Sequence, residues 1–171
     1  QIYNDAVILE TDATLSGADV TFMSTVDDDG NGATGSGLVV NASGTARFND
    51  EVGGVNPIDS ITTDASGTTE INADVFVSGG TMTFNDDVVL TDSIQLTDAG
   101  GTGITFTKTL TGDHNLSLNV SDPGAEAVFQ GSVEIGNGFG PSLDLNATSA
   151  GSTTFEDTVT LASGITQRAG A

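Results

Sequence analysis

Residues 80–90 decide the fold, because near-copies of this stretch recur along the whole chain. They read Gly80-Thr81-Met82-Thr83-Phe84-Asn85-Asp86-Asp87-Val88-Val89-Leu90. The same motif is legible in residues 44–52 and 151–161. Weaker copies begin at four further aromatic residues, Tyr3, Phe22, Phe106 and Phe129. Internal repetition of this kind indicates a repeat architecture.

The spacing of the aromatic residues supports stacked repeats. Those of the repeated motif fall at positions 3, 22, 48, 84, 106, 129 and 155, so the successive gaps are 19, 26, 36, 22, 23 and 26 residues. Stacked coils would lay these rings over one another in one interior row, with Phe84, Phe106, Phe129 and Phe155 on adjacent coils. The gap of 36 residues fits two short coils, or one coil plus a displaced hairpin around residues 75–80, and the sequence leaves both open.

Short runs of β-branched and apolar residues alternate with polar ones before each cluster of Gly, Asn or Asp, which is typical of strands and turns. No segment has a sustained helical period, so essentially no helix is expected. An apolar residue such as Leu38 lies ten residues before an aromatic one such as Phe48, and a corner sequence such as residues 41–44 lies between them. One repeat is then a roughly triangular coil.

We therefore predict an all-β fold: a parallel β-helix, or β-solenoid, of about seven coils. Residues 1–171 would form a single segment of imperfect repeats of roughly 19–26 residues. At the ~4.8 Å spacing of strands, seven coils would extend about 30–35 Å. The alternative is an antiparallel sandwich, which also has regularly spaced short strands but does not require the same residue type at the same place in each repeat.

The chain is strongly acidic, with 24 Asp and Glu against 3 Lys and Arg and a net charge of -21. Such a charge repels nucleic acid and anionic membrane surfaces, and it makes cations the natural partners. A protein adapted to a salty environment would show the same imbalance, because salt screens the self-repulsion of a carboxylate-rich surface. We expect no binding of nucleic acid and no insertion into a membrane.

Cysteine is absent, which excludes disulfides, thiolate metal sites and a cysteine nucleophile. No apolar run approaches the ~18 residues of a membrane span. The first residues, 1–5, do not form a signal peptide and instead resemble the middle of a repeat. We therefore expect a mature product or an excerpt of a longer protein.

Residues 60–72 and the recurring Gly-Thr-x-x-Phe-Asn-Asp-x-Val motif resemble the repeats of filamentous-haemagglutinin-like adhesins and of the large β-strand-repeat surface proteins of bacteria. The similarity spans nearly the whole chain. It implies a right-handed parallel β-helix on the cell exterior that acts as a stalk, a fibre or an adhesive surface. The chain departs from those adhesins because it lacks their amino-terminal secretion domain and any Arg-Gly-Asp sequence.

One segment has the spacing of a calcium loop. Asp27, Asp29, Asn31 and Gly32 stand at positions 1, 3, 5 and 6 of such a loop, where oxygen ligands converge and Gly permits a sharp turn. Position 12 is Leu38 in place of the usual bidentate Glu. Asp27, Asp29 and Asn31 are therefore candidate Ca²⁺ ligands, and the alternative is a solvated acidic hairpin loop. No other cofactor is expected.

Signals for catalysis are weak, and we do not expect an enzyme. His114 is the only histidine, and its neighbours Asp113 and Asn115 indicate a turn. The alternative to a non-enzymatic role is a polysaccharide lyase or glycoside hydrolase that acts in a β-helix groove. Such an enzyme needs a carboxylate pair or a basic residue beside a sugar cleft. Thr105, Thr107, Thr109 and Thr111 alternate as if along one strand and could present a row of hydroxyls to ice or a glycan, although ordinary β-propensity also explains them.

The function we expect is that of an extracellular structural or adhesive segment, a cell-surface stalk, fibre or matrix filament. Its partners would be copies of itself or flanking repeats that meet open solenoid ends, together with surface glycans. A last expectation concerns the coil register: Lys108 should lie over Asp86 in an exposed bend and offset carboxylate repulsion there.

Overall fold

The computed structural model describes residues 1–32, 35–136, 143–147 and 152–169, which form 22 β-strands and no helix. Every pairing between these strands is parallel. The strands make three long sheets, named sheets A, B and C. None of the described residues belongs to a helix that could span a membrane.

Sheet A contains eight strands, one from each successive turn of the chain. In spatial order they are β1 (Ile2–Tyr3), β4 (Val20–Phe22), β7 (Thr45–Phe48), β9 (Thr68–Ile71), β12 (Asp87–Leu90), β15 (Leu110–Gly112), β18 (Val133–Ile135) and β21 (Val159–Leu161).

Sheet B contains five strands, β10 (Val75–Val77), β13 (Ile94–Asp98), β16 (Leu116–Val120), β19 (Leu143–Ala147) and β22 (Ile165–Ala169). The pair β2 (Val7–Leu9) and β5 (Val26–Asp28) continues the same side toward the N-terminus. Val52 links the two parts, because it bridges to Val26 in β5 and to Val75 in β10.

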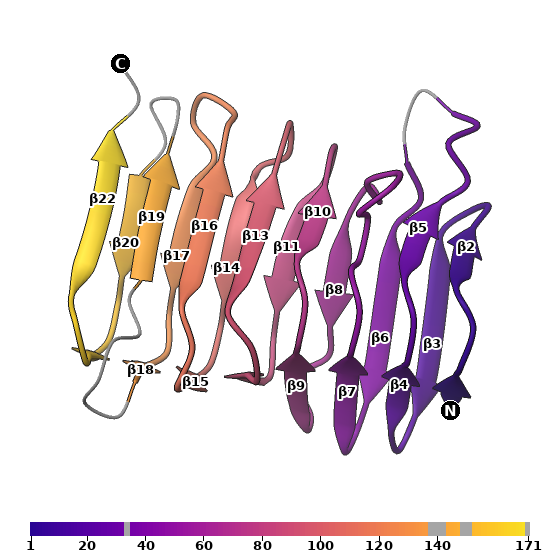
Figure 1. Ribbon diagram of the computed structural model, residues 1–171, viewed down its shortest axis with the longest axis horizontal. Helices are drawn as coiled ribbons and strands as arrows, with labels where there is room; N and C mark the ends of the chain where they lie inside the picture. The colour runs from indigo at the N-terminus through magenta and orange to yellow at the C-terminus, as the bar shows by residue number, and fades with distance from the viewer. Residues whose placement is uncertain (33–34, 137–142, 148–151, 170–171) are drawn as a thin grey trace.

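Sheet C contains seven strands, β3 (Ala13–Gly17), β6 (Leu38–Ala42), β8 (Ile61–Thr63), β11 (Thr81–Phe84), β14 (Gly103–Phe106), β17 (Glu126–Phe129) and β20 (Ser152–Phe155). The chain visits sheets A, B and C in turn, so the strands lie side by side along the long axis and the two termini lie at opposite ends (Figure 1). The eight strands of sheet A and the seven of sheet C correspond to seven and six complete turns. The predicted parallel β-solenoid is confirmed.

Strict alternation of inward and outward side chains builds the core. In residues 81–90 every even-numbered residue is buried and every odd-numbered one is half-exposed. The inward positions of all three sheets meet in one continuous cluster of apolar residues. Because each coil has the same small cross-section, each interior side chain packs mainly against the equivalent side chains of the coils on either side.

Seven of the aromatic residues form two interior stacks on different sheets. Phe84, Phe106, Phe129 and Phe155 share one register position of sheet C, with ring centroids 5.2, 5.0 and 4.8 Å apart. This confirms the predicted stack. Tyr3, Phe22 and Phe48 form a second stack on sheet A, with centroid distances of 5.2 and 5.2 Å.

The sequence predicts a single aromatic row, and this prediction is wrong between Phe48 and Phe84, because the two residues lie on different sheets. In sheet A, Ile71 follows Phe48 in register, and in sheet C, Thr63 precedes Phe84. The gap of 36 residues holds one full coil plus the further path from sheet A to sheet C, and residues 75–77 form strand β10 of sheet B in place of a hairpin. The same motif ends a strand of sheet A at Phe48 and a strand of sheet C at Phe84. The motif alone therefore does not indicate to which sheet the strand belongs, because the corner after either strand uses an Asn or Asp bend.

Aspartate side chains fasten the corners of neighbouring coils together. Oδ1 of Asp12, Asp19, Asp64 and Asp74 accepts a hydrogen bond from a backbone N–H of an adjacent coil, at 2.7–2.9 Å. The donors are the amides of Gly37, Thr45, Ala42 and Gln95, respectively. The four donors lie within a residue or two of the end of a strand, and the carboxylates satisfy these backbone N–H groups where the strand ladders stop. Part of the acidic composition is therefore structural.

Candidate functional site

The candidate calcium ligands lie at the end of strand β5 and in the loop that follows it. Asp27 is only 4% exposed, and its Oδ1 accepts hydrogen bonds from the amides of Val55 at 2.9 Å and Asn56 at 3.3 Å. Asp29 accepts from the backbone N–H of Asn31 at 2.9 Å and from its Nδ2 at 3.1 Å. Asp27 thus holds the loop of the next coil, while Asp29 and Asn31 close a local turn.

Asp28, between two of the candidate ligands, is the residue whose role the sequence reasoning missed. Its side chain points inward and is 6% exposed, with Oδ1 accepting from the amide of Gly30 and Oδ2 from that of Ser36, both at 2.8 Å. The hydrogen bond from the Gly30 amide lowers the pKa of Asp28 below its ordinary value. The described part of the chain contains no group of three or more His, Cys, Asp or Glu side chains that could hold a metal ion. Calcium binding by Asp27, Asp29 and Asn31 stays a prediction.

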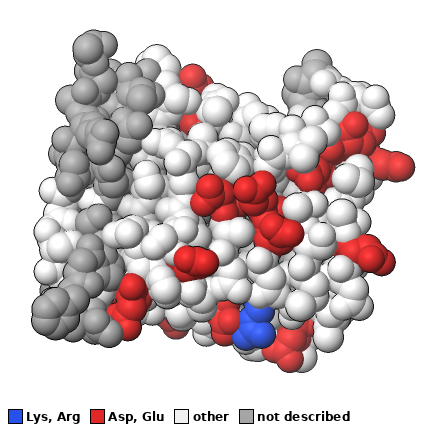
Figure 2. Space-filling model, in the orientation of Figure 1, with Lys and Arg blue, Asp and Glu red and all other residues white. Residues whose placement is uncertain are grey.

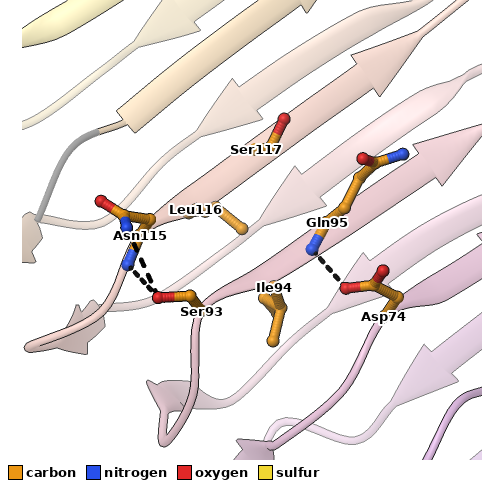
Figure 3. A pocket seen from close by; sticks show the side chains of 7 residues that line it. All are labelled: Asp74, Ser93, Ile94, Gln95, Asn115, Leu116 and Ser117. Atoms are coloured by element: carbon orange, nitrogen blue, oxygen red, sulfur yellow. Dashed lines mark hydrogen bonds between the residues drawn. The ribbon is translucent and has the colours of Figure 1, made fainter.

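A shallow hollow of about 430 Å³ lies on the outer face of sheet B (Figure 3). Its lining comes from strands β13 and β16 and from the corners that precede β10, β13 and β16. The seven lining residues are Asp74, Ser93, Ile94, Gln95, Asn115, Leu116 and Ser117.

Coil stacking places the polar residues of the hollow in two rows that cross the strands. Gln95 lies in register with Ser117, and its backbone N–H donates to Oδ1 of Asp74 at 2.7 Å. In the second row, the backbone N–H and Nδ2 of Asn115 donate to Oγ of Ser93 at 3.2 and 3.5 Å. Each row therefore presents one polar group per coil, at the spacing of the strands.

The lining offers hydroxyl and amide groups and a single carboxylate. Ile94 and Leu116, at 4% and 0% exposure, form the base between the two rows. Asp74 is the only ionisable residue of the seven, and one of its oxygens already accepts from the Gln95 amide. Glycoside hydrolases use a pair of carboxyl groups. The hollow is therefore suited to hydrogen bonding with a polar ligand rather than to acid–base chemistry.

Acidic side chains are scattered over the same face, most densely from its N-terminal end to its middle, with one basic patch at the lower edge (Figure 2). Such a surface repels anionic ligands. No Lys, Arg or His belongs to the lining of the hollow.

The expected threonine row does not run along one strand. Thr105 lies in β14 of sheet C and Thr111 in β15 of sheet A, with Thr107 and Thr109 in the corner between them. The prediction that these four hydroxyl groups form one flat row is therefore wrong. His114 lies in the next corner, between β15 and β16.

The expected Lys108–Asp86 contact is wrong as well. Nζ of Lys108 donates to the backbone carbonyl of Ala65 at 2.6 Å. Asp86 is 1% exposed and faces the interior, where it accepts from Oγ1 of Thr63 at 2.7 Å and Oγ1 of Thr69 at 2.9 Å. Burial raises the pKa of Asp86 above its ordinary value. Counting by twos from Phe84 to Val88 would have placed Asp86 inside, because the alternation continues through the corner.

Asp98 is a further interior carboxylate, fully buried at the end of strand β13. It accepts from the amides of Gly101 at 2.7 Å and Gly103 at 2.6 Å, which closes the corner between sheets B and C. Burial raises its pKa. Asp28 closes the same kind of corner three coils earlier with the same use of two backbone amides.

Comparisons of the chain with protein-family models, with curated proteins and with solved structures found no match. The resemblance to filamentous-haemagglutinin-like adhesins is therefore carried by the repeated motifs alone.

Proposed function

We propose that this chain is an extracellular structural segment, a stiff β-solenoid that serves as part of a cell-surface stalk, fibre or matrix filament and presents an adhesive face. The observation that carries the proposal is the continuous parallel ladder with stacked interior rows. In such a solenoid, length grows by adding coils while the cross-section stays constant, which suits a spacer better than a compact binding domain.

Composition supports the same role. The fold obtains its cohesion from backbone pairing, interior stacking and the corner carboxylates, with no cysteine in the chain. A net charge of -21 keeps an exposed fibre hydrated and limits unspecific clumping. The partners in this proposal are flanking repeats or other copies of the chain that continue the ladder at either end. An exposed strand edge pairs readily with a further strand.

Immunogold electron microscopy tests the proposal on cells that express the protein, with antibodies raised against this chain. The expected result is gold along fibres or stalks outside the cell envelope. Gold confined to the cell interior would overturn the proposal. A second arm joins two copies end to end in register and measures small-angle X-ray scattering. The maximum dimension should rise by about 30–35 Å with an unchanged cross-section, whereas two flexibly linked particles would count against a stiff fibre.

A product assay distinguishes the structural proposal from the alternative, a polysaccharide lyase or glycoside hydrolase. Incubation of the chain with neutral and acidic polysaccharides should release no new reducing ends or unsaturated products. Release of either would replace the structural proposal by the enzymatic one.

A further inference from the structure

We infer that the hollow on sheet B binds a neutral glycan, whose chain lies along the solenoid axis and crosses strands β13 and β16. This inference gives a ligand to the adhesive face of the proposed function and rests on that function only in this respect. The ligand class follows from the groups that line the hollow and from their arrangement in two rows.

The charge of the hollow selects a neutral ligand. Its seven lining residues contain one carboxylate and no basic group, in a protein of net charge -21. An anionic glycan or a phosphate would find no counter-charge here and would meet a repulsive field. A cationic ligand would find a single carboxylate, one of whose oxygens already accepts the Gln95 amide.

The chemistry of the lining matches sugar hydroxyls. Ser93 and Ser117 carry hydroxyl groups that can both donate and accept, and Gln95 and Asn115 carry amides with both functions. Sugar hydroxyl groups also donate and accept, so either partner can adapt to the other. The half-buried Gln95 is held by its Nε2, which donates to Oγ1 of Thr97 at 2.9 Å, so its side chain is oriented before a ligand arrives.

The direction of the ligand follows from the register. Gln95 and Ser117 belong to adjacent strands, as do Ser93 and Asn115, so polar groups recur across the strands at about 4.8 Å. Ile94 and Leu116 face the interior, so along a single strand the two rows are two residues, or about 6.6 Å, apart. An extended polymer that crosses the strands therefore meets polar groups at closer intervals than one that follows a strand.

The lining has no aromatic ring on which a sugar could stack, so the affinity of one hollow should be weak. A fibre with many such segments would bind a polysaccharide through avidity.

The inference is tested by titrating the uniformly ¹⁵N-labelled chain with cellohexaose, maltohexaose and mannohexaose and following the backbone amide resonances by NMR. A hexamer of galacturonate serves as the anionic counterpart. The expected result is that at least one neutral hexasaccharide shifts the amides of residues 93–95 and 115–117, and that hexagalacturonate does not. Absence of shifts with all three neutral probes, or equal shifts with hexagalacturonate, would overturn the inference.

Variants of the hollow complete the test. Gln95→Ala and Ser117→Ala each remove outward side-chain groups from the hollow and should weaken binding roughly three- to tenfold. Thr105→Ala, on the outer face of sheet C, is the matched control and should leave binding unchanged. Equal losses in all three variants would also overturn the inference. Failure of this inference can be told apart from failure of the proposed function. The protein can be a stalk on the cell surface that does not bind glycans, or it can bind glycans and prove to be intracellular.

Discussion

Oγ1 of Thr63 donates a 2.7 Å hydrogen bond to Oδ1 of Asp86 inside the solenoid, between residues of neighbouring coils. Thr63 lies in register with Phe84, so this bond occupies the interior beside the first ring of the sheet C stack. Thr69, on the neighbouring sheet, donates to the same carboxylate at 2.9 Å. The core thus contains a carboxylate whose partners are hydroxyl groups and which forms no ion pair among the described residues.

Replacement of Asp86 by Asn should stabilise the protein at neutral pH. Burial raises the pKa of Asp86, so the folded state binds more protons than the unfolded chain between the ordinary aspartate pKa and the raised one. The stability contributed by protonated Asp86 is fully present below the ordinary pKa and is lost as the pH rises through the raised pKa. Asn is neutral at every pH, and the two threonine hydroxyls can rotate to donate to its oxygen or to accept from its amide.

Urea denaturation of the wild type and Asp86→Asn at pH 4 and pH 7 measures this effect. The advantage of the variant in unfolding free energy should be larger at pH 7. The control is Thr69→Val, which removes a donor from the charged carboxylate and should cost about 1–3 kcal/mol at pH 7. An advantage of Asp86→Asn that does not change between the two pH values would contradict the role assigned to burial.

Replacement of Phe106 by Ala should lower the unfolding free energy by about 3–5 kcal/mol, because the ring is 1% exposed and stacks between Phe84 and Phe129. The matched control is Thr105→Ala, which changes the outward neighbour on the same strand and should stay within about 0.5 kcal/mol. Chemical denaturation of both variants makes the measurement. Similar losses in the two would mean that the core does not alternate as described.

Much of the fold was predictable from the sequence because two kinds of information are local. Alternation of apolar and polar residues predicted strands with one buried face, and the recurrence of Phe84, Phe106 and Phe129 predicted their stacking. The change of sheet between Phe48 and Phe84 could not be predicted, because the same motif serves either corner. The sheet that a strand joins depends on the number of residues in each side of the coil, and this number changes with the length of the loops between strands.

The candidate site was harder to predict than the fold. The hollow joins residues such as Asp74 and Ser117, which lie 43 positions apart and belong to no sequence motif. Finding them requires the coil register, which rests on many weak stacking preferences at once. The position of Asp86 is hard to predict for a different reason: aspartate side chains usually face solvent, but the two-residue alternation places this one in the interior.

Arg47 and Glu70 should show a small, salt-sensitive coupling. They occupy adjacent outward positions of sheet A, where Nε of Arg47 lies 2.6 Å from Oε2 of Glu70. Their side chains are 41% and 26% exposed, so solvent screens the pair and a double-mutant cycle with Ala should give about 0.2–1 kcal/mol. The coupling should fall as NaCl rises from 0.02 to about 1 M, where the Debye length is ~3 Å. A larger coupling that salt does not reduce would mean that the pair is buried in solution.

Replacement of Asp28 by Asn should have the opposite effect to the same change at Asp86. Oδ1 of Asp28 accepts from the amide of Gly30 and Oδ2 from that of Ser36, and these backbone donors cannot rotate into acceptors. An Asn side chain would place an NH₂ group against one of the two N–H groups, so the unfolding free energy of the variant should fall by about 1–3 kcal/mol at pH 7.

The effect should depend on pH, because the pKa of Asp28 is lowered. The stability that the Asp28 carboxylate contributes is present above the ordinary aspartate pKa and is lost as the pH falls through the lowered one. The cost of Asp28→Asn, measured by urea denaturation, should therefore shrink toward pH 2 while that of the control Phe106→Ala stays constant. A variant as stable as the wild type at pH 7 would show that the loop after β5 does not depend on this carboxylate.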